Sequence, residues 1–164
     1  MVSCAFAWVT AARPSTSPAV AAIGHLVSAP SIAAGPIYRD GRLPTVTASG
    51  TADSLTVDNP YYFRVIFDTS NQGSALALYV RQVLGLRTAS IIYSAEDFGL
   101  SFTPAFTAAF ERLGGTVRNT WRYETTADRQ APSLATIAAG LRADPEAGMV
   151  LLAVSPNTAA RDVV

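Results

Sequence analysis

The sequence is poor in the residues that build disulfides and most metal sites. Among its 164 residues there is one cysteine, Cys4, and one histidine, His25. A disulfide framework needs paired cysteines, and the common zinc sites need several cysteine or histidine ligands. Neither kind of site can therefore be built within a single chain.

Charge is also scarce. Only 15% of the residues are charged, and 12 basic residues balance 12 acidic ones. The arginines are scattered and form no basic run. Formal charge thus gives no electrostatic reason to expect a nucleic-acid partner or an anionic membrane surface.

No apolar run approaches the roughly 20 residues that a membrane-spanning helix needs. Residues 1–12 are mostly small and apolar, as in a secretory signal, but they lack a basic start and are interrupted by Ser3, Cys4 and Thr10. The turn-rich residues 13–18 follow. We therefore expect residues 1–18 to be an irregular N-terminal segment, with no convincing signal peptide.

The usual catalytic patterns are missing as well. There is no glycine-flanked serine elbow, no glycine-rich dinucleotide loop and no phosphate-binding Gly-Lys-Ser/Thr sequence. His25 is the only histidine, and a lone histidine at a strand end more often makes a structural hydrogen bond than acts in catalysis. The adjacent Glu96 and Asp97 are better explained as a solvated turn or helix cap than as a catalytic pair. We expect a protein that is not an enzyme.

Apolar residues make up 49% of the chain, which is enough for a buried core. Runs typical of strands alternate with stripes typical of helices, and this order predicts an α/β fold with doubly wound parallel sheets. The expected strands are residues 19–24, 45–47, 62–67, 88–93, 116–123 and 149–154. The expected helices lie around residues 31–38, 69–84, 102–113 and 134–141.

Several local features sharpen these expectations. The continuous apolar runs 19–24 and 149–154 are typical of strands buried on both faces. Thr69 and Gln72 have the spacing of a capping box, with Gly85 closing that helix. Pro104 is tolerable if it falls in the first turn of its helix.

Small polar or aromatic residues follow four of the expected strands, namely Ser28, then Ser49, Gly50 and Thr51, then Phe98, then Ser155 to Asn157. In a single parallel sheet these loops emerge at one edge, where α/β proteins bind ligands. Hydroxyl and backbone N–H groups suit a carboxylate. The alternative, that serine, glycine and threonine are simply common in turns, has equal weight at this point.

An ordered succession of motifs resembles a known family. Gly24–Ser28, Ser31–Tyr38 and Leu43–Thr51 look like the first-lobe pattern of the leucine/isoleucine/valine-binding proteins of ABC importers, which are type I periplasmic solute-binding proteins. The similarity continues through Asn59–Arg64, and then through Gln72-Gly73, Ile91–Tyr93 and Phe98-Gly99.

The resemblance implies two α/β lobes that close on a solute, with hinge residues near 67–70. The lobes would be a partial first lobe at residues 19–68 and a partial second lobe at residues 69–164. It also implies a periplasmic or extracellular location, a small-molecule ligand such as an amino acid, an ABC permease partner, and no cofactor or metal.

Carried over by motif, Ser28 and Thr51 would bind the ligand's α-carboxylate, and the Ser49 and Gly50 backbone would meet its carboxylate or ammonium. Phe98 would close the cleft from the second lobe, where the family usually has tyrosine. Ser155 stands where an aromatic residue is common, and Gly50 replaces a common alanine.

The similarity also implies that the opening β-α unit and the later half of the family pattern, with its acidic partner for the ligand ammonium, are missing. Two alternatives therefore stay open. The chain could be the ligand-sensing part of a receptor or regulator, since the fold is reused for sensing. It could also be a truncated product that binds nothing.

Overall fold

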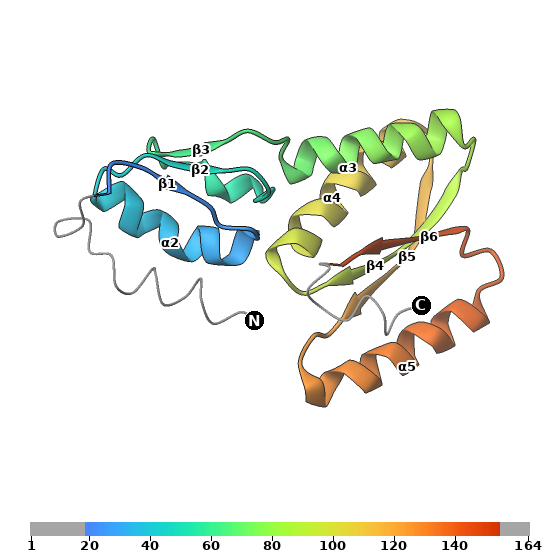
Figure 1. Cartoon of the computed structure of the whole chain (residues 1–164). Coiled ribbons are helices and arrows are strands. Elements are labelled where there is room, and N and C mark those ends of the chain that lie inside the picture. The colour runs from blue at the N-terminus through green and yellow to red at the C-terminus, as the bar shows by residue number, and fades with distance from the viewer. Residues whose placement is uncertain (1–18, 155–164) are drawn as a thin grey trace. The chain divides into compact units, whose positions relative to one another are not determined.

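The computed structural model describes residues 19–154 and divides the chain into two compact units, with the division between Asp68 and Thr69. Each unit has its own parallel sheet (Figure 1). The predicted α/β class with parallel sheets is thereby confirmed.

The first unit is a three-stranded sheet with one helix. The strand order is β1-β2-β3, and all pairs are parallel. Its elements are β1 (Ala22–Ile23), α2 (Ser28–Asp40), β2 (Thr45–Thr47), the 3-10 turn η1 (Asp53–Leu55) and β3 (Tyr62–Arg64). The β2 bounds are those predicted, whereas β1 and β3 are shorter than the runs 19–24 and 62–67.

The two faces of this sheet differ. Thr45 and Tyr62 are buried on the face toward α2. On the other face, Ile23, Val46 and Phe63 are register partners across the three strands, yet Ile23 is 90% exposed and Phe63 51%. The expectation that the first strand is buried on both faces is therefore wrong. Among the described residues only one helix packs on this sheet.

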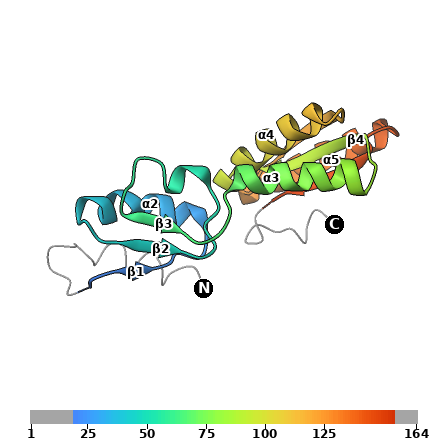
Figure 2. The same ribbon diagram turned by 90° about the horizontal axis from the view of Figure 1, so that it is seen from above.

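The second unit is larger, and helices cover both faces of its sheet (Figure 1); Figure 2 shows the unit turned by 90°. Its strand order is β5-β4-β6, again parallel throughout. The elements are α3 (Thr69–Leu78), a π-helical continuation η2 (Tyr79–Val83), β4 (Thr88–Ser94), α4 (Asp97–Arg112), β5 (Thr116–Tyr123), α5 (Ala127–Ala143) and β6 (Met149–Ala153).

Alternate residues of β4 supply the two halves of the core. Ile91 packs with α3 and α4, where Phe102, Phe106 and Phe110 stack in sequence with ring centroids 6.3 and 5.3 Å apart. Ile92 faces the opposite side and packs with residues of α5. This alternation is what a strand between two helical layers requires.

Helix α3 differs from its prediction in two respects. The buried residues are Gly73, Ala77 and Val80. Tyr79 and Val83 are 50% and 67% exposed, although the three- and four-residue spacing of Leu76, Tyr79, Val80, Val83 and Leu84 predicts one buried stripe. The π-helical turn η2 begins at Tyr79, so it accounts for the exposure of Val83, because a wider turn rotates the residues that follow away from the α-helical phase. Gln72 Oε1 is buried and accepts no hydrogen bond within residues 19–154, so the predicted capping box is not formed.

Helix α4 begins earlier than expected and ends as expected. Pro104 lies seven residues beyond the first helical residue, Asp97, so its placement in the first turn is wrong; the residue is exposed, which leaves its ring in solvent. At the other end, Gly115 N–H donates to Phe110 O and Gly114 N–H to Glu111 O. This pair of bonds, with Gly114 at φ +77°, is a Schellman cap.

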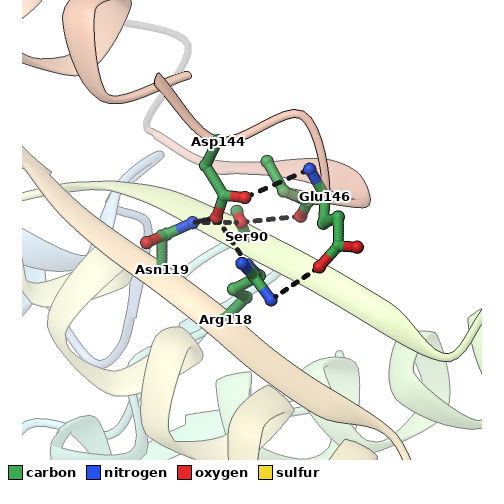
Figure 3. Close-up of polar contacts among 6 residues, drawn as sticks. Ser90, Arg118, Asn119, Asp144 and Glu146 are labelled. Atoms are coloured by element: carbon green, nitrogen blue, oxygen red, sulfur yellow. Dashed lines mark hydrogen bonds and ion pairs between the residues drawn. The ribbon is translucent and has the colours of Figure 1, made fainter. Parts of the chain in front are cut away.

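Strand β6 is an edge of the described sheet and β4 is central. Val150 and Leu152 of β6 are 40% and 38% exposed, so the expectation that this strand is buried on both faces is wrong. The loop before β6 is held by polar contacts (Figure 3). Asp144 Oδ2 accepts from Arg118 Nε at 2.6 Å and from Asn119 Nδ2 at 2.8 Å. These bonds, the one from Arg118 foremost, lower the pKa of the Asp144 carboxyl.

No helix within residues 19–154 has both the length and the apolar character needed to cross a membrane.

Candidate ligand-binding site

In the first unit, two loops meet beyond the carboxyl ends of β1 and β2. The Ala52 N–H donates to Ser28 Oγ at 3.1 Å, and Ser49 Oγ donates to the carbonyl oxygen of Leu26 at 2.7 Å. Two hydrogen bonds, one to a side chain and one to a backbone carbonyl, therefore join the loop after β2 to the loop after β1. Ser28, Ser49, Gly50 and Thr51 are brought to one edge of this sheet, as expected for parallel strands.

Ser28 is the residue best arranged to meet a ligand. It is the first residue of α2, and its Oγ accepts a hydrogen bond from Ala52, so its own hydroxyl proton is left to be donated elsewhere. The first turn of α2 carries no acidic residue. A hydroxyl donor at the positive end of a helix suits an anionic group such as a carboxylate.

Ser49 and Gly50 hold the loop through their N–H groups. Both donate to Thr47 Oγ1, at 3.4 and 3.0 Å, and Thr47 Oγ1 in turn donates to the carbonyl oxygen of His25 at 3.0 Å. The backbone groups that Ser49 and Gly50 could offer a ligand are therefore their carbonyl oxygens, which suit an ammonium rather than a carboxylate.

Gly50 lies where the surrounding atoms leave little space for a side chain. It is buried, and a Cβ built on it would lie 2.8 Å from Leu55 Cδ1 and 3.1 Å from Thr47 Oγ1. The leucine methyl is the end of a flexible side chain and can move, whereas the threonine oxygen is fixed by its hydrogen bonds. Glycine at this position lets the loop fold close over Thr47.

Two residues that hold this loop were not found by the sequence reasoning. Thr47 reads in the sequence as an ordinary β-branched strand residue, although it is fully buried and bonds three backbone groups. Arg64 belongs to the motif Asn59–Arg64 but was given no role. Its Nη1 donates to the carbonyl oxygens of Thr51 and Ala52.

His25 takes part in an aromatic cluster on the α2 side of the sheet. Its Nε2 lies 3.1 Å from the Tyr38 hydroxyl, and the Tyr62 hydroxyl donates to the carbonyl oxygen of Gly24. Burial lowers the pKa of His25 and raises the pKa of both tyrosines. The neutral forms are thus favoured, in keeping with the structural hydrogen bond expected of a lone histidine.

The remaining candidates belong to the second unit. Phe98 follows β4 in the first turn of α4, and its ring stacks on Phe102 with centroids 5.3 Å apart. The expectation of four loops at one edge of a single sheet is wrong, because Phe98 and the Ser28 to Thr51 group belong to separate sheets. Ser155 to Asn157 lie outside the described residues.

Gly99 explains why Phe98 is placed as it is. A Cβ at residue 99 would run into the carbonyl oxygen of Ser94 and lie 2.9 Å from that of Ala153. Only glycine allows the first turn of α4 to approach the ends of β4 and β6 this closely.

The structure shows no gathering of three or more His, Cys, Asp or Glu side chains that could hold a metal ion within residues 19–154.

Comparison with known sequence families adds the decisive observation. A family model described as periplasmic binding protein matches residues 10–161. The chain belongs to the periplasmic binding protein family. The family that the motifs predicted is thereby confirmed.

Solved structures of periplasmic binding proteins share this fold. An ABC transporter substrate-binding protein from Desulfitobacterium hafniense superposes with a TM-score of 0.73 and 22% identity, and a structure of that description from the same organism, in complex with Leu, with 0.75 and 22%. A leucine-binding protein from Thermotoga maritima gives 0.69 and 24%. The matches cover 85–96% of this chain but only 40–45% of those proteins, so the chain spans less than half their length.

One curated protein is similar in sequence over a shorter stretch. The glutamate receptor 2.7 of Arabidopsis thaliana is 34% identical over 79 residues, which is 48% of this chain and 8% of the receptor.

Proposed function

We propose that this periplasmic binding protein chain serves the extracytoplasmic capture of a branched-chain amino acid, or a similar small polar organic solute, for delivery to an ABC permease. Membership of the family supports solute binding, and solved relatives described as leucine-binding or in complex with Leu support the ligand class. The same family relationship supports a location outside the cytoplasm. The proposal includes no enzymatic step.

The observation that carries the proposal is the arrangement of Ser28. Its oxygen is occupied by the Ala52 N–H, so its proton is free to point toward an anion at the start of α2. The carbonyl oxygens of Ser49 and Gly50 stand on the same loop as Thr51. A group that donates to a carboxylate beside groups that accept from an ammonium is the chemistry that an amino acid requires.

We assign the site to Ser28, Ser49, Gly50 and Thr51 of a first lobe, residues 19–68, and to Phe98 and Ser155 of a second lobe, residues 69–164. Phe98 would supply an apolar wall. Closure of the two lobes around the solute would bend the chain near residues 67–70, close to the division between the two compact units.

A thermal-melt screen tests this function. Leucine, isoleucine, valine, small amides and aromatic acids are added one at a time, and a solute that binds only the folded chain raises its melting temperature. At 100 times its dissociation constant a ligand adds about 2.7 kcal/mol of stability, which is a shift of several degrees. No shift from any of them at millimolar concentration would contradict binding by this chain.

The Ser28→Ala substitution identifies the site once a ligand is found. Loss of a hydrogen bond to a charged group weakens binding by about tenfold or more. Ser54→Ala, at the exposed position of the turn η1 in the same unit, is the matched control and leaves the affinity unchanged. Equal affinities for wild type and Ser28→Ala would remove Ser28 from the site.

The similarity to a plant glutamate receptor favours a second candidate, a ligand-sensing role within a receptor. The same binding chemistry would then drive a conformational signal instead of transport. The genomic neighbourhood separates the two, because an adjacent ABC permease gene supports transport and a fused membrane or signalling domain supports sensing.

A further inference from the structure

Arg64, at the end of β3, carries a nearly enclosed cation whose side chain is 11% exposed. Its Nη1 donates to the carbonyl oxygens of Thr51 at 3.1 Å and Ala52 at 2.9 Å, and Nη2 lies 3.4 Å from Thr56 Oγ1. Asp68 Oδ2 is 3.8 Å from Nη2. Most of the hydrogen bonds made by this guanidinium are therefore directed at the loop that follows β2.

Arg64 and Ser28 bind opposite ends of the same peptide group. The carbonyl of Thr51 and the N–H of Ala52 belong to one planar unit, so fixing one end fixes the direction of the other. Arg64 holds the carbonyl end, and the N–H end donates to Ser28 Oγ. A cation on the carbonyl also polarises the peptide and strengthens the bond that its N–H makes.

We infer that Arg64 is a positioning residue of the ligand site. It orients the Thr51–Ala52 peptide so that the Ala52 N–H occupies one lone pair of Ser28 Oγ, which directs the Ser28 proton outward. It also fixes the backbone of Thr51. The consequence for ligand affinity rests on the proposed function, whereas the effect on the loop does not.

A purely structural role for Arg64 makes a different prediction. If Arg64 acted only as the ion-pair partner of Asp68, then Asp68→Asn would reproduce its loss. If Arg64 acts through the loop carbonyls, Asp68→Asn leaves the loop unchanged, because the bonds to Thr51 and Ala52 remain.

The test is amide hydrogen exchange in the ligand-free protein, comparing wild type with Arg64→Gln. We expect the Ala52 amide to exchange about tenfold faster or more, since its ordering depends on the lost bonds. The Gly50 amide, which donates to Thr47 Oγ1, is the internal control and keeps its rate. An unchanged Ala52 rate, or equal acceleration of both amides, overturns the inference.

Two further variants and one ligand arm complete the test. Arg64→Lys keeps the charge but lacks the planar fork, so it gives an intermediate exchange rate at Ala52. In Asp68→Asn we expect the Ala52 amide to exchange at the wild-type rate. If its exchange is accelerated as much as in Arg64→Gln, the inference is overturned. Leucine affinity falls about tenfold in Arg64→Gln. If wild type binds no solute, the proposed function fails while the exchange rates still decide the role of Arg64.

Discussion

The two units hold a parallel sheet against helices by different means. In the second unit the strands span five to eight residues, helices cover both faces, and a row of stacked phenylalanines fills one side. In the first unit the strands span two or three residues, and one face carries the exposed Ile23 and Phe63.

The first unit has less apolar packing and is held in part by polar contacts. Thr47, Ser28 and Arg64 each bond backbone groups of a neighbouring loop. Hydrogen bonds of this kind are directional, so they fix the positions of loop atoms more narrowly than apolar packing does. The comparison indicates that the second unit supplies rigidity by packing, whereas the first unit uses buried hydroxyls and one cation to shape a loop.

The largest expected effect is in the packed core of the second unit. Phe106 is fully buried between Phe102 and Phe110, so Phe106→Ala leaves a cavity and lowers the free energy of unfolding by about 3–5 kcal/mol. Urea unfolding followed by the fluorescence of Trp121, which packs in the other half of this core, measures the loss. A loss below about 1 kcal/mol would contradict the role given to packing.

A smaller effect is expected from the buried hydroxyl of the first unit. Thr47→Val deprives the Ser49 and Gly50 N–H groups of their acceptor and lowers stability by about 2 kcal/mol. Thr45→Val is the matched control on the same strand. Thr45 is equally buried, but its hydroxyl makes a single bond, to the carbonyl of Leu43, so about 1 kcal/mol is lost.

Native-state hydrogen exchange of the β2 and β3 amides resolves the two threonine variants, because it reports the first unit separately. Equal losses for Thr45→Val and Thr47→Val would show that the loop bonds contribute nothing beyond an ordinary buried hydroxyl.

The smallest effect is expected on the uncovered face of the first sheet. Ile23→Thr changes the free energy of unfolding by no more than about 0.5 kcal/mol, because the side chain is already in solvent. Ile92→Thr, at a buried position of β4, costs about 2 kcal/mol for the hydroxyl it buries. A comparable cost at Ile23, measured by urea unfolding, would mean that this face is covered in the protein in solution.

Strand positions were largely predictable from sequence, and burial was less so. Apolar and polar residues alternate in 116–123, and this two-residue period predicts β5 correctly because it is typical of a strand that is partly exposed to solvent. The apolar run 19–24 says only that a strand could be buried, and what packs on it is a property of the whole assembly. The π-helical turn after Leu78 has no simple residue signal, so the expected burial of Val83 is wrong.

The edge of the sheet at which Ser28 and Thr51 lie was predictable, whereas the residues that hold their loop in place were not. Ser28 and Thr51 stand out as polar groups just beyond strand ends. The role of Thr47 could not be predicted, because threonine is common in strands. Its hydroxyl holds the loop only because the chain turns back and brings the Ser49 and Gly50 N–H groups onto it. The sequence does indicate that Arg64 has a partner, since it is a charged residue between the apolar Phe63 and Val65. It does not indicate that the partners are the carbonyl oxygens of Thr51 and Ala52.

Gly99 sets a limit on how this protein can change. Since no side chain fits between the first turn of α4 and the carbonyl oxygens of Ser94 and Ala153, position 99 is closed to substitution. The neighbouring position has more room, because Phe98 is half-buried at the border of the core and stacks on Phe102. Substitutions that probe the proposed ligand site can therefore be made at position 98 but not at position 99.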